Sequence, residues 1–266
     1  MSSRKQSAQY EYEGFAYFPK LYSDAELNGV GDVLERFHTA WLDSNAEVYK
    51  DGAINSAYLT DSQYLNDEDR LQLFKFIGSH KISSVLGAVL ASEVMFVGSQ
   101  LFFDPADMQQ QNYWHRDIQY NDMTEEQQRA AMLVSNNLHL RIALKSERGV
   151  GLVPGTHRRW DDGHEYDVRM ERNGQQAHSD LPNGIEVEME RGDVLVFSAN
   201  MIHRGLYGND RRSLDLLFGG ADPETARFVK EEALPNAEQL SQLEWPSPFN
   251  IAREITSELK SGSALT

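Results

Sequence analysis

Two histidines and one aspartate in this chain could together hold a metal ion. His115 and Asp117 stand two residues apart in a run that begins at Trp114, and residues at that spacing on a β-strand point to the same face. His203, which follows the apolar run 192–202, is expected to supply a third ligand. Two imidazoles and one carboxylate on one face of a metal leave three positions open, which suits non-haem iron(II) oxygen chemistry.

A His-x-Asp triplet can arise by chance, and the chain contains a second one. His178 and Asp180 have the same spacing, but they lie in a run rich in Gln, Asn and Gly with no strand pattern beside it. Because a metal site needs rigid support, we interpret this triplet as an exposed loop. The same interpretation, structural or exposed, applies to the other histidines: His38, His80, His139, His157 and His164.

An arginine pair follows His203 and opens an apolar strand. Arg211 and Arg212 precede Ser213 and the run 214–218. A planar guanidinium binds a carboxylate through two parallel hydrogen bonds, as a dicarboxylate co-substrate beside the metal would require. A register error of one residue would exchange the two arginines, so Arg211 is the alternative to Arg212.

The composition limits the class of protein and its partners. The 266 residues, 40% of them hydrophobic, can bury one sizeable core, and we expect a single domain over 1–266. The formal net charge of −16 would repel phosphate backbones and anionic membrane surfaces, so we expect neither nucleic acid nor a membrane as a partner. The chain has no Cys, which excludes thiolate ligands. No stretch has the length or character of a signal peptide or membrane span, and we expect a cytoplasmic protein.

The first ninety residues contain two helical patterns. Ser23 and Glu26 form a capping-box motif ahead of apolar residues at helical spacing. A second helical pattern covers about 67–89, with Gly78 as a weak point. Further helices are predicted at 124–132, after Asp222 and over 246–259. The segment 158–182 is highly charged and is predicted to be a long surface loop.

After Ser92 the pattern changes to short apolar or alternating runs separated by Gly, Asn, Asp and Pro, which indicates strands. These runs predict a mainly β fold with flanking helices: a double-stranded β-helix, or cupin-like jelly roll, with its core at about 94–220. The predicted strands are 94–97, 101–103, 113–120, 138–144, 150–153, 185–189, 194–198 and 214–218.

Four motifs follow one another within this region. They are Gln100 ahead of Asp104-Pro105, the run Trp114-His115-Arg116-Asp117, the turn Pro154-Gly155-Thr156-His157, and Gly192-Asp193 leading to His203 and Arg212-Ser213. In this order they resemble the phytanoyl-CoA dioxygenase family of Fe(II)- and 2-oxoglutarate-dependent oxygenases. Thr156 stands where the family more usually has Ser, a mild change.

The resemblance implies a set of functional residues. It gives His115, Asp117 and His203 as the Fe(II) ligands and Arg212 as the anchor of the distal carboxylate of 2-oxoglutarate. Gln100 and Ser213 are further candidate contacts of the co-substrate. Because halogenating relatives replace the ligand carboxylate with a small residue, Asp117 favours hydroxylation of a C–H bond in a small-molecule substrate, with dioxygen consumed and succinate and carbon dioxide released.

Two other functions are compatible with the same fold. A metal-dependent isomerase or lyase using manganese or zinc would recruit further His or Glu ligands. A non-catalytic ligand-binding barrel would release no succinate, and its metal content would not respond to His115→Ala. The sequence does not specify the substrate, the choice among hydroxylation, desaturation, epoxidation and cyclisation, or the oligomeric state.

Overall fold

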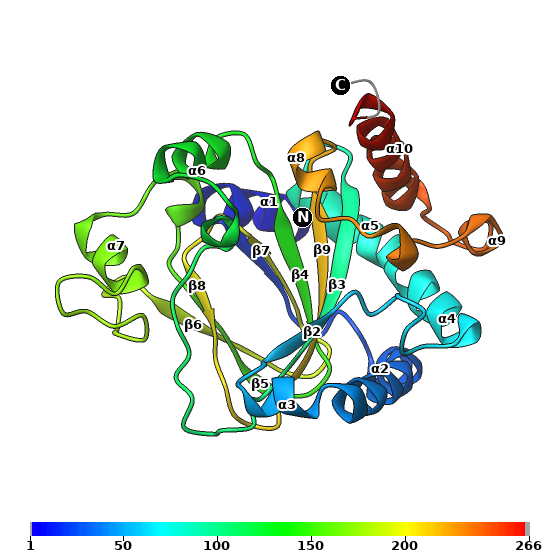
Figure 1. Ribbon diagram of the computed structural model, residues 1–266, viewed down its shortest axis with the longest axis horizontal. Helices are drawn as coiled ribbons and strands as arrows, with labels where there is room; N and C mark the ends of the chain where they lie inside the picture. The colour runs from blue at the N-terminus through cyan, green and yellow to red at the C-terminus, as the bar shows by residue number, and fades with distance from the viewer. Residues whose placement is uncertain (1, 264–266) are drawn as a thin grey trace.

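The chain forms two antiparallel β-sheets that face each other and are flanked by helices (Figure 1). The computed structural model describes residues 2–263, so residues 1 and 264–266 of the expected domain lie outside the described residues. The larger sheet has six strands in the order β1 (Phe15–Phe18), β7 (Val194–Ser198), β4 (Leu138–Ala143), β9 (Arg212–Gly219), β3 (Met95–Phe103) and β2 (Asn55–Ala57). The smaller sheet has the order β6 (Ile185–Met189), β5 (Glu147–Leu152) and β8 (His203–Gly205). This is the predicted jelly roll.

The larger sheet has one apolar face and one polar face. On β4, Leu140 packs into the main core beneath the helices, whereas His139 and Arg141 point into the space between the sheets. On β9, Asp215 faces the same space and bonds both of those side chains. Because side chains alternate along a strand, polar residues at every second position mark the interior of the jelly roll.

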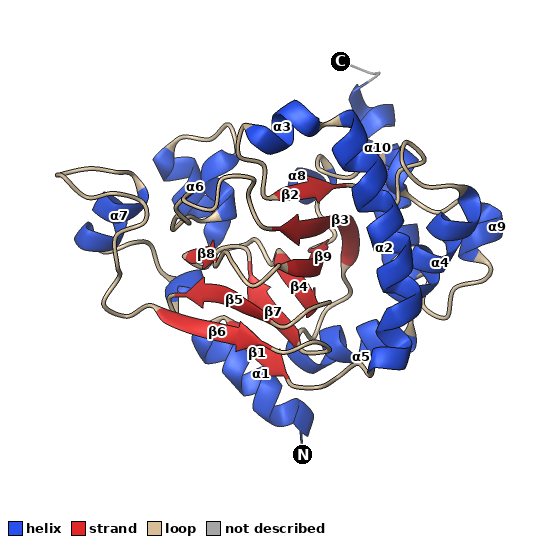
Figure 2. Cartoon of the chain, turned by 90° about the horizontal axis from the view of Figure 1, so that it is seen from below, coloured by secondary structure: helices blue, strands red, loops and turns tan. Residues whose placement is uncertain are grey.

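Helices cover the apolar face of the larger sheet (Figure 2). They are α2 (Asp24–Ser44), α4 (Asp67–Ile77), α5 (His80–Val89) and α10 (Ser247–Ser263). The predicted capping box starts α2, where the backbone amide of Ser23 donates to the Glu26 carboxylate at 2.9 Å. The remaining helical segments are α1 (Ser2–Glu13), α3 (Ala46–Lys50), α6 (Glu125–Met132), α7 (Gly163–Arg169), α8 (Pro223–Ala226), α9 (Ala237–Leu240) and the 3-10 helices η1 (Asp117–Tyr120), η2 (Thr156–Arg158) and η3 (Glu231–Ala233).

Four predicted elements differ from the structure. The helix expected over 67–89 is two helices, because Ser79 caps α5 by accepting from the amide of Ile82 at 3.4 Å. The strands expected at 94–97 and 101–103 are one continuous strand, β3. The strand expected at 113–120 does not form: only His115 makes a β-bridge, and the chain turns into η1 at Asp117.

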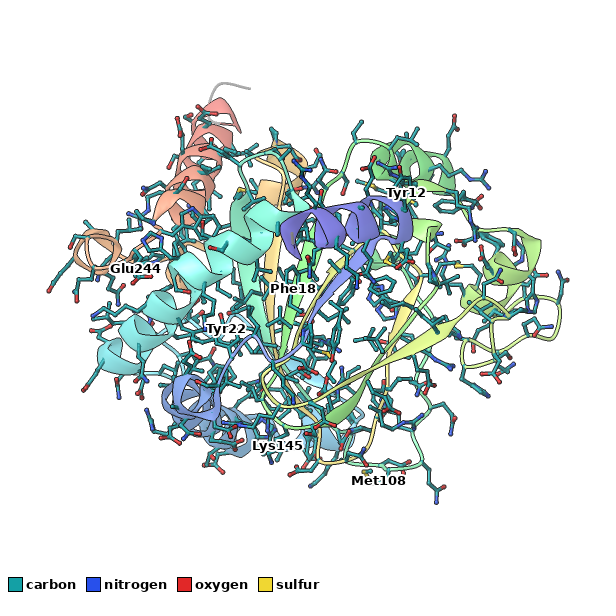
Figure 3. All side chains as sticks on the ribbon, turned by 180° about the vertical axis from the view of Figure 1, so that it is seen from behind. Tyr12, Phe18, Tyr22, Met108, Lys145 and Glu244 are labelled. Atoms are coloured by element: carbon teal, nitrogen blue, oxygen red, sulfur yellow. The ribbon has the colours of Figure 1, made fainter. Side chains whose placement is uncertain are left out.

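The motif Gly192-Asp193 attaches the N-terminal segment to the jelly roll. Figure 3 labels Phe18, the last residue of β1, and Tyr22 on the connection from β1 to α2. The amide of Tyr22 donates to the carbonyl of Gly192 at 3.0 Å, and a Cβ on Gly192 would lie 2.2 Å from the carbonyl oxygen of Tyr22. Asp193 accepts from the amide of Lys20 at 2.7 Å. The glycine is therefore required by close backbone contact, and the aspartate fixes the turn ahead of β7.

The segment 158–182, predicted to be a charged surface loop, contains the helix α7 and is held by a buried ion-pair network to the segment with His115 and Asp117. Arg116, which is 0% exposed, donates through Nε to Asp161 at 2.8 Å and through Nη1 to the carbonyl of Thr156 at 2.7 Å. Arg169 on α7 bonds the other oxygen of Asp161 at 2.6 Å. Burial lowers the pKa of Arg116 to about 10, against the opposing effect of Asp161.

Arg116→Met is expected to destabilise the fold by about 3–5 kcal/mol, because Asp161 then keeps only Arg169 as a counter-ion. The buried carbonyls of Thr156 and Asn200 also lose their donor. The free energy of unfolding in urea measures this effect. Arg158→Met is the matched control, since the Arg158 side chain is 61% exposed and lies 3.9 Å from Glu11. Equal free energies of unfolding for the two variants would contradict the structural role of Arg116.

A buried histidine on α2 gives the fold a dependence on pH. His38 is 7% exposed and its ring centroid lies 4.7 Å from that of Phe103. Burial, aided by Arg212, lowers the pKa of His38 to about 4. The unfolded chain takes up a proton near the ordinary value of about 6.5. The stabilisation that comes from burying a neutral His38 is therefore fully present above the unfolded pKa, and it is lost as the pH falls toward 4.

The parent is expected to lose roughly 2 kcal/mol more stability than His38→Phe when the pH falls from about 7 to about 5. Urea unfolding at the two pH values measures the difference. His164→Phe, a change at an exposed position, should retain the pH dependence of the parent. An unchanged pH dependence in His38→Phe would contradict the assignment.

Within residues 2–263, no helix is both long enough and apolar enough to cross a membrane.

Candidate metal centre

A backbone bridge brings His115 and His203 together. The amide of each residue donates to the carbonyl of the other at 2.9 Å. This antiparallel pairing sets the two imidazoles side by side, with ring centroids 4.2 Å apart. The two segments, far apart in the sequence, therefore meet at one place between the sheets, as predicted. His203 lies at the start of β8, after the turn that follows β7, and not at the end of a long strand.

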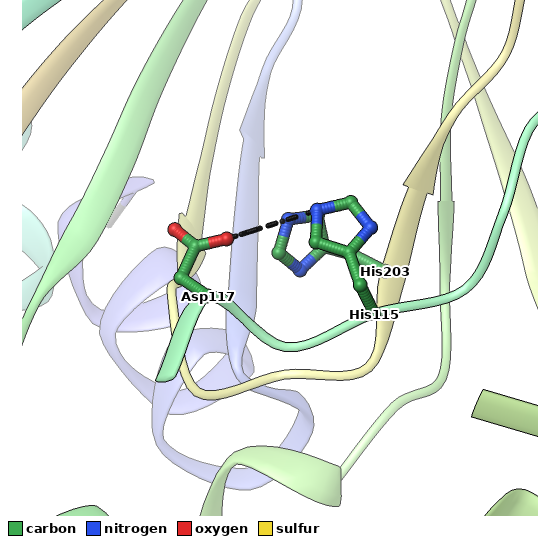
Figure 4. Close-up of side chains that lie close together, drawn as sticks. All are labelled: His115, Asp117 and His203. Carbon is green, nitrogen blue, oxygen red and sulfur yellow. Dashed lines mark ion pairs between the residues drawn. The ribbon is translucent and has the colours of Figure 1, made fainter. Parts of the chain in front are cut away.

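Asp117 reaches the same place by way of a turn. The chain enters η1 at this residue, and the amide of Asp117 donates to the carbonyl of Ala199 at 3.2 Å. Its Oδ1 lies 3.3 Å from Nε2 of His203 and 3.8 Å from Nε2 of His115. One ligand atom from each of the three residues lies within 4.8 Å of the others, and the side chains point toward one another in Figure 4.

Both imidazoles are oriented as metal ligands. Nδ1 of His115 lies 3.1 Å from the carbonyl of Tyr113, and Nδ1 of His203 lies 3.0 Å from the carbonyl of Met201. Each Nδ1–H donates to its carbonyl, which leaves the Nε2 lone pair free for a metal. Burial and the neighbouring His203 lower the pKa of His115 to about 3, so this ring is neutral at physiological pH. The donor set of two imidazoles and one carboxylate fits Fe(II).

The structure adds a third histidine that the sequence analysis had interpreted as structural or exposed. Nε2 of His139 lies 2.6 Å from Oδ2 of Asp117, and its Nδ1 lies 3.2 Å from Oδ2 of Asp215. Burial alone would lower the pKa of His139, but the Asp117 and Asp215 carboxylates raise it to about 9. One signal for it was in the sequence: in Leu138–Ile142, charged or polar residues alternate with apolar ones.

The structure separates the two neighbouring arginines. Arg212 points to the helix-covered side of the sheet, where its Nε lies 3.2 Å from Oε1 of Glu35 on α2. Arg211 is 1% exposed and lies on the interior side, with its guanidinium carbon 5.0 Å from the Phe102 ring centroid. A Cβ at Gly205 would come within 2.9 Å of the Arg211 guanidinium, so the glycine leaves the room that this group occupies. Arg212, the expected anchor, is therefore not brought together with the metal ligands.

The Arg211 guanidinium has no hydrogen-bond partner among the described residues, although it is buried. Its Nε lies 3.9 Å from Oε2 of Glu147, an ion-pair distance without a hydrogen bond. Burial and the nearby Arg141 lower the pKa of Arg211 to about 10. A buried cation with five unused N–H donors is costly unless an anion binds there. This side chain fits the carboxylate of a co-substrate.

The two further candidate contacts also face the interior. Gln100 lies opposite Asp215 in the pairing of β3 with β9, and Phe102 lies opposite Ser213. Ser213 is 0% exposed, and its hydroxyl donates to Oε2 of Glu147 at 2.5 Å. Both residues thus belong to the face that carries Arg211.

The turn that includes Pro154 and Thr156 is hydrogen-bonded to the segment just before His203. The Thr156 hydroxyl donates to the carbonyl of Val153 at 2.6 Å and accepts from the amide of Ile202 at 3.0 Å. A serine hydroxyl can make the same two bonds, which explains why Thr is tolerated. The second triplet does not join the site: the Asp180 side chain is 96% exposed and lies 3.6 Å from Arg204.

The family model described as phytanoyl-CoA dioxygenase matches residues 10–212, which include all three ligands and both arginines. The chain belongs to the phytanoyl-CoA dioxygenase family. It is therefore an enzyme of the class of Fe(II)- and 2-oxoglutarate-dependent oxygenases, with His115, Asp117 and His203 as its candidate metal triad. The family implies a small-molecule substrate and dioxygen.

Several solved structures share the fold of this family member. The α-ketoglutarate-dependent carbocyclase SnoK from nogalamycin biosynthesis is 17% identical, with 84% of this chain and 87% of SnoK covered at a TM-score of 0.57. Apo HygX from Streptomyces hygroscopicus is 14% identical, with 82% and 87% covered at 0.59. Iron-bound EctD from S. alaskensis is 15% identical, with 82% and 76% covered at 0.53. No curated protein matches the chain in sequence.

Proposed function

We propose that this member of the phytanoyl-CoA dioxygenase family is a dioxygenase that hydroxylates a C–H bond of a small molecule, with 2-oxoglutarate as co-substrate. One observation carries the proposal: three metal-ligand atoms within 4.8 Å of one another share the jelly-roll interior with a buried guanidinium that has no partner among the described residues. HygX has been solved with nickel and 2-oxoglutarate bound, and the epimerase SnoN with Fe3+ and α-ketoglutarate.

The three ligands would hold Fe(II) through Nε2 of His115, Nε2 of His203 and Oδ1 of Asp117. Iron and 2-oxoglutarate together supply the activation of dioxygen. The two imidazoles would supply Nε2 lone pairs, and their Nδ1–H bonds to backbone carbonyls fix the ring planes. The protein's own part in the reaction is to orient these donors and the substrate.

Arg211 would bind the distal carboxylate of 2-oxoglutarate. Its guanidinium carbon lies 5.0 Å from the Phe102 ring centroid, and the group has room because residue 205 is glycine. Nη1 of Arg141 is also buried without a partner among the described residues, and its guanidinium carbon lies 4.5 Å from the same ring. Unpaired guanidinium donors beside one apolar ring favour an anionic ligand over a neutral one. Gln100 and Ser213 are proposed as further contacts.

The side chains around His115 are the proposed walls of the substrate site. Ring centroids of Tyr113 and Tyr120 lie 5.1 Å and 5.7 Å from that of His115, and the two residues are 37% and 60% exposed. The Asp117 side chain is also 37% exposed, so the metal site is reached from this side. Aromatic faces beside the open metal positions suit an organic substrate rather than an inorganic one.

An anaerobic titration tests the proposal. Addition of Fe(II) and then 2-oxoglutarate should produce the weak visible charge-transfer absorption of the metal chelate, and air should then release succinate in the presence of a substrate. A library of small molecules scored by succinate release, followed by mass analysis of the products, identifies the substrate and tells a gain of oxygen from cyclisation or epimerisation. Absence of both the absorption band and succinate would refute the proposal.

A further inference from the structure

We infer that His139 is a positioning residue: it holds Asp117 by one carboxylate oxygen so that the other is presented to the metal as a single ligand atom. This inference rests on the proposed metal site but not on the use of 2-oxoglutarate. The two carboxylate oxygens of Asp117 have different neighbours. Oδ1 lies on the side of the two ligand imidazoles, whereas Oδ2 accepts from Nε2 of His139 at 2.6 Å.

His139 is itself held rigidly. Its ring lies flat against the Phe197 ring, with centroids 4.7 Å apart and an angle of 3° between the planes. Its Nδ1 lies 3.2 Å from Oδ2 of Asp215. Asp215 is fixed in turn by Arg141, whose Nε and Nη2 donate to the two carboxylate oxygens at 2.6 and 2.8 Å. Both ring nitrogens therefore face carboxylates, and the imidazole has no rotational freedom to release Asp117.

The same geometry argues against His139 as a fourth metal ligand. Its Nε2 is committed to Asp117, and its ring centroid lies 5.8 Å from that of His203, compared with 4.2 Å between the two ligand rings. A carboxylate on a turn, without such a bond, could swing its second oxygen onto the metal and occupy a position needed by the co-substrate or dioxygen. His139 thus preserves an open coordination position, which is a task distinct from metal ligation.

The test is Co(II) binding to the full chain without 2-oxoglutarate, followed by the visible absorption of the bound ion, which responds to coordination geometry. His139→Phe keeps the ring stack on Phe197 and removes the donor. It is expected to weaken Co(II) binding about 10–100-fold, as loss of a partner of a metal ligand typically does, and to change the shape of the Co(II) band. His139→Gln, whose amide can donate to Oδ2, should restore a large part of the affinity and the parent band.

His38→Phe is the matched control, because it replaces a buried histidine in an aromatic environment on the other side of the sheet. It should bind Co(II) like the parent. Thermal unfolding of the metal-free proteins checks that each variant is folded, and His139→Met replaces the Phe variant if that variant is not.

Co(II) affinity and absorption of His139→Phe within twofold of the parent would overturn the inference. So would an equal loss in the Phe and Gln variants, because the donated hydrogen bond would then be irrelevant. Failure of the proposed function has a different signature: Co(II) would still bind and respond to His139, but 2-oxoglutarate would neither perturb the band nor be converted to succinate.

Discussion

Arg211→Met is expected to weaken the binding of 2-oxoglutarate by at least about a hundredfold, while Arg212→Met should bind it as the parent does. Loss of the guanidinium leaves a buried carboxylate without its partner, which costs about 2–5 kcal/mol, and a hundredfold change corresponds to about 2.7 kcal/mol. The 2-oxoglutarate dependence of the Fe(II) chelate absorption under anaerobic conditions measures the affinity of each variant.

The neighbouring arginines form a matched control pair, since they have the same side chain and stand next to each other at the start of β9, Arg211 just before the strand and Arg212 as its first residue. Arg212 forms an ion pair with Glu35, whose side chain is 53% exposed, and such a pair contributes less than about 1 kcal/mol to stability. The proposal for Arg211 would be contradicted if Arg212→Met lost the co-substrate and Arg211→Met retained it.

Asp117→Ala is expected to reduce succinate release by a factor on the order of a thousand, because a ligated metal supplies several kcal/mol of catalysis. The variant should also bind less than one equivalent of Fe(II) under conditions that saturate the parent. Bound iron measured after anaerobic gel filtration, together with succinate release, checks both effects.

Asp180→Ala is the matched control, since it removes the carboxylate of the second His-x-Asp triplet. The Asp180 side chain is 96% exposed and lies 3.6 Å from Arg204, so its loss should change neither iron content nor turnover. If Asp180→Ala abolished iron binding and Asp117→Ala did not, the metal centre would have been assigned to the wrong triplet.

Much of the site could be predicted from residue types and their order. Short apolar runs separated by turn residues after Ser92 predicted the jelly roll. In a strand that buries one face, apolar side chains recur at every second residue. The run that contains His115 and Asp117 was preferred to His178 and Asp180 because strand-like sequence surrounds only the first, although the structure forms no strand there beyond the bridge at His115. The choice of His203 as the third ligand followed from its place after an apolar run.

The sequence did not decide which face of a strand forms the interior. Ser213 and Asp215 lie on the polar face of β9, and Arg211 falls on the same side by alternation. Arg212 falls on the opposite side, with apolar Leu214. Periodicity shows that residues share a face, but contacts with α2 decide that the apolar face lies outside the jelly roll. For this reason Arg211 is the proposed anchor, although the sequence analysis favoured Arg212.

The sequence by itself determined the kinds of ligand, their order along the chain and the class of fold, since these depend on local residue types and on short repeats. Only the tertiary structure decided that Asp117 arrives by a 3-10 turn, that Arg116 is buried in an ion-pair network and that His139 contacts a metal-ligand carboxylate. The physical reason is that each of these depends on contacts between segments 22 or more residues apart, and a side chain has the same composition and spacing whether its partner is water or a carboxylate.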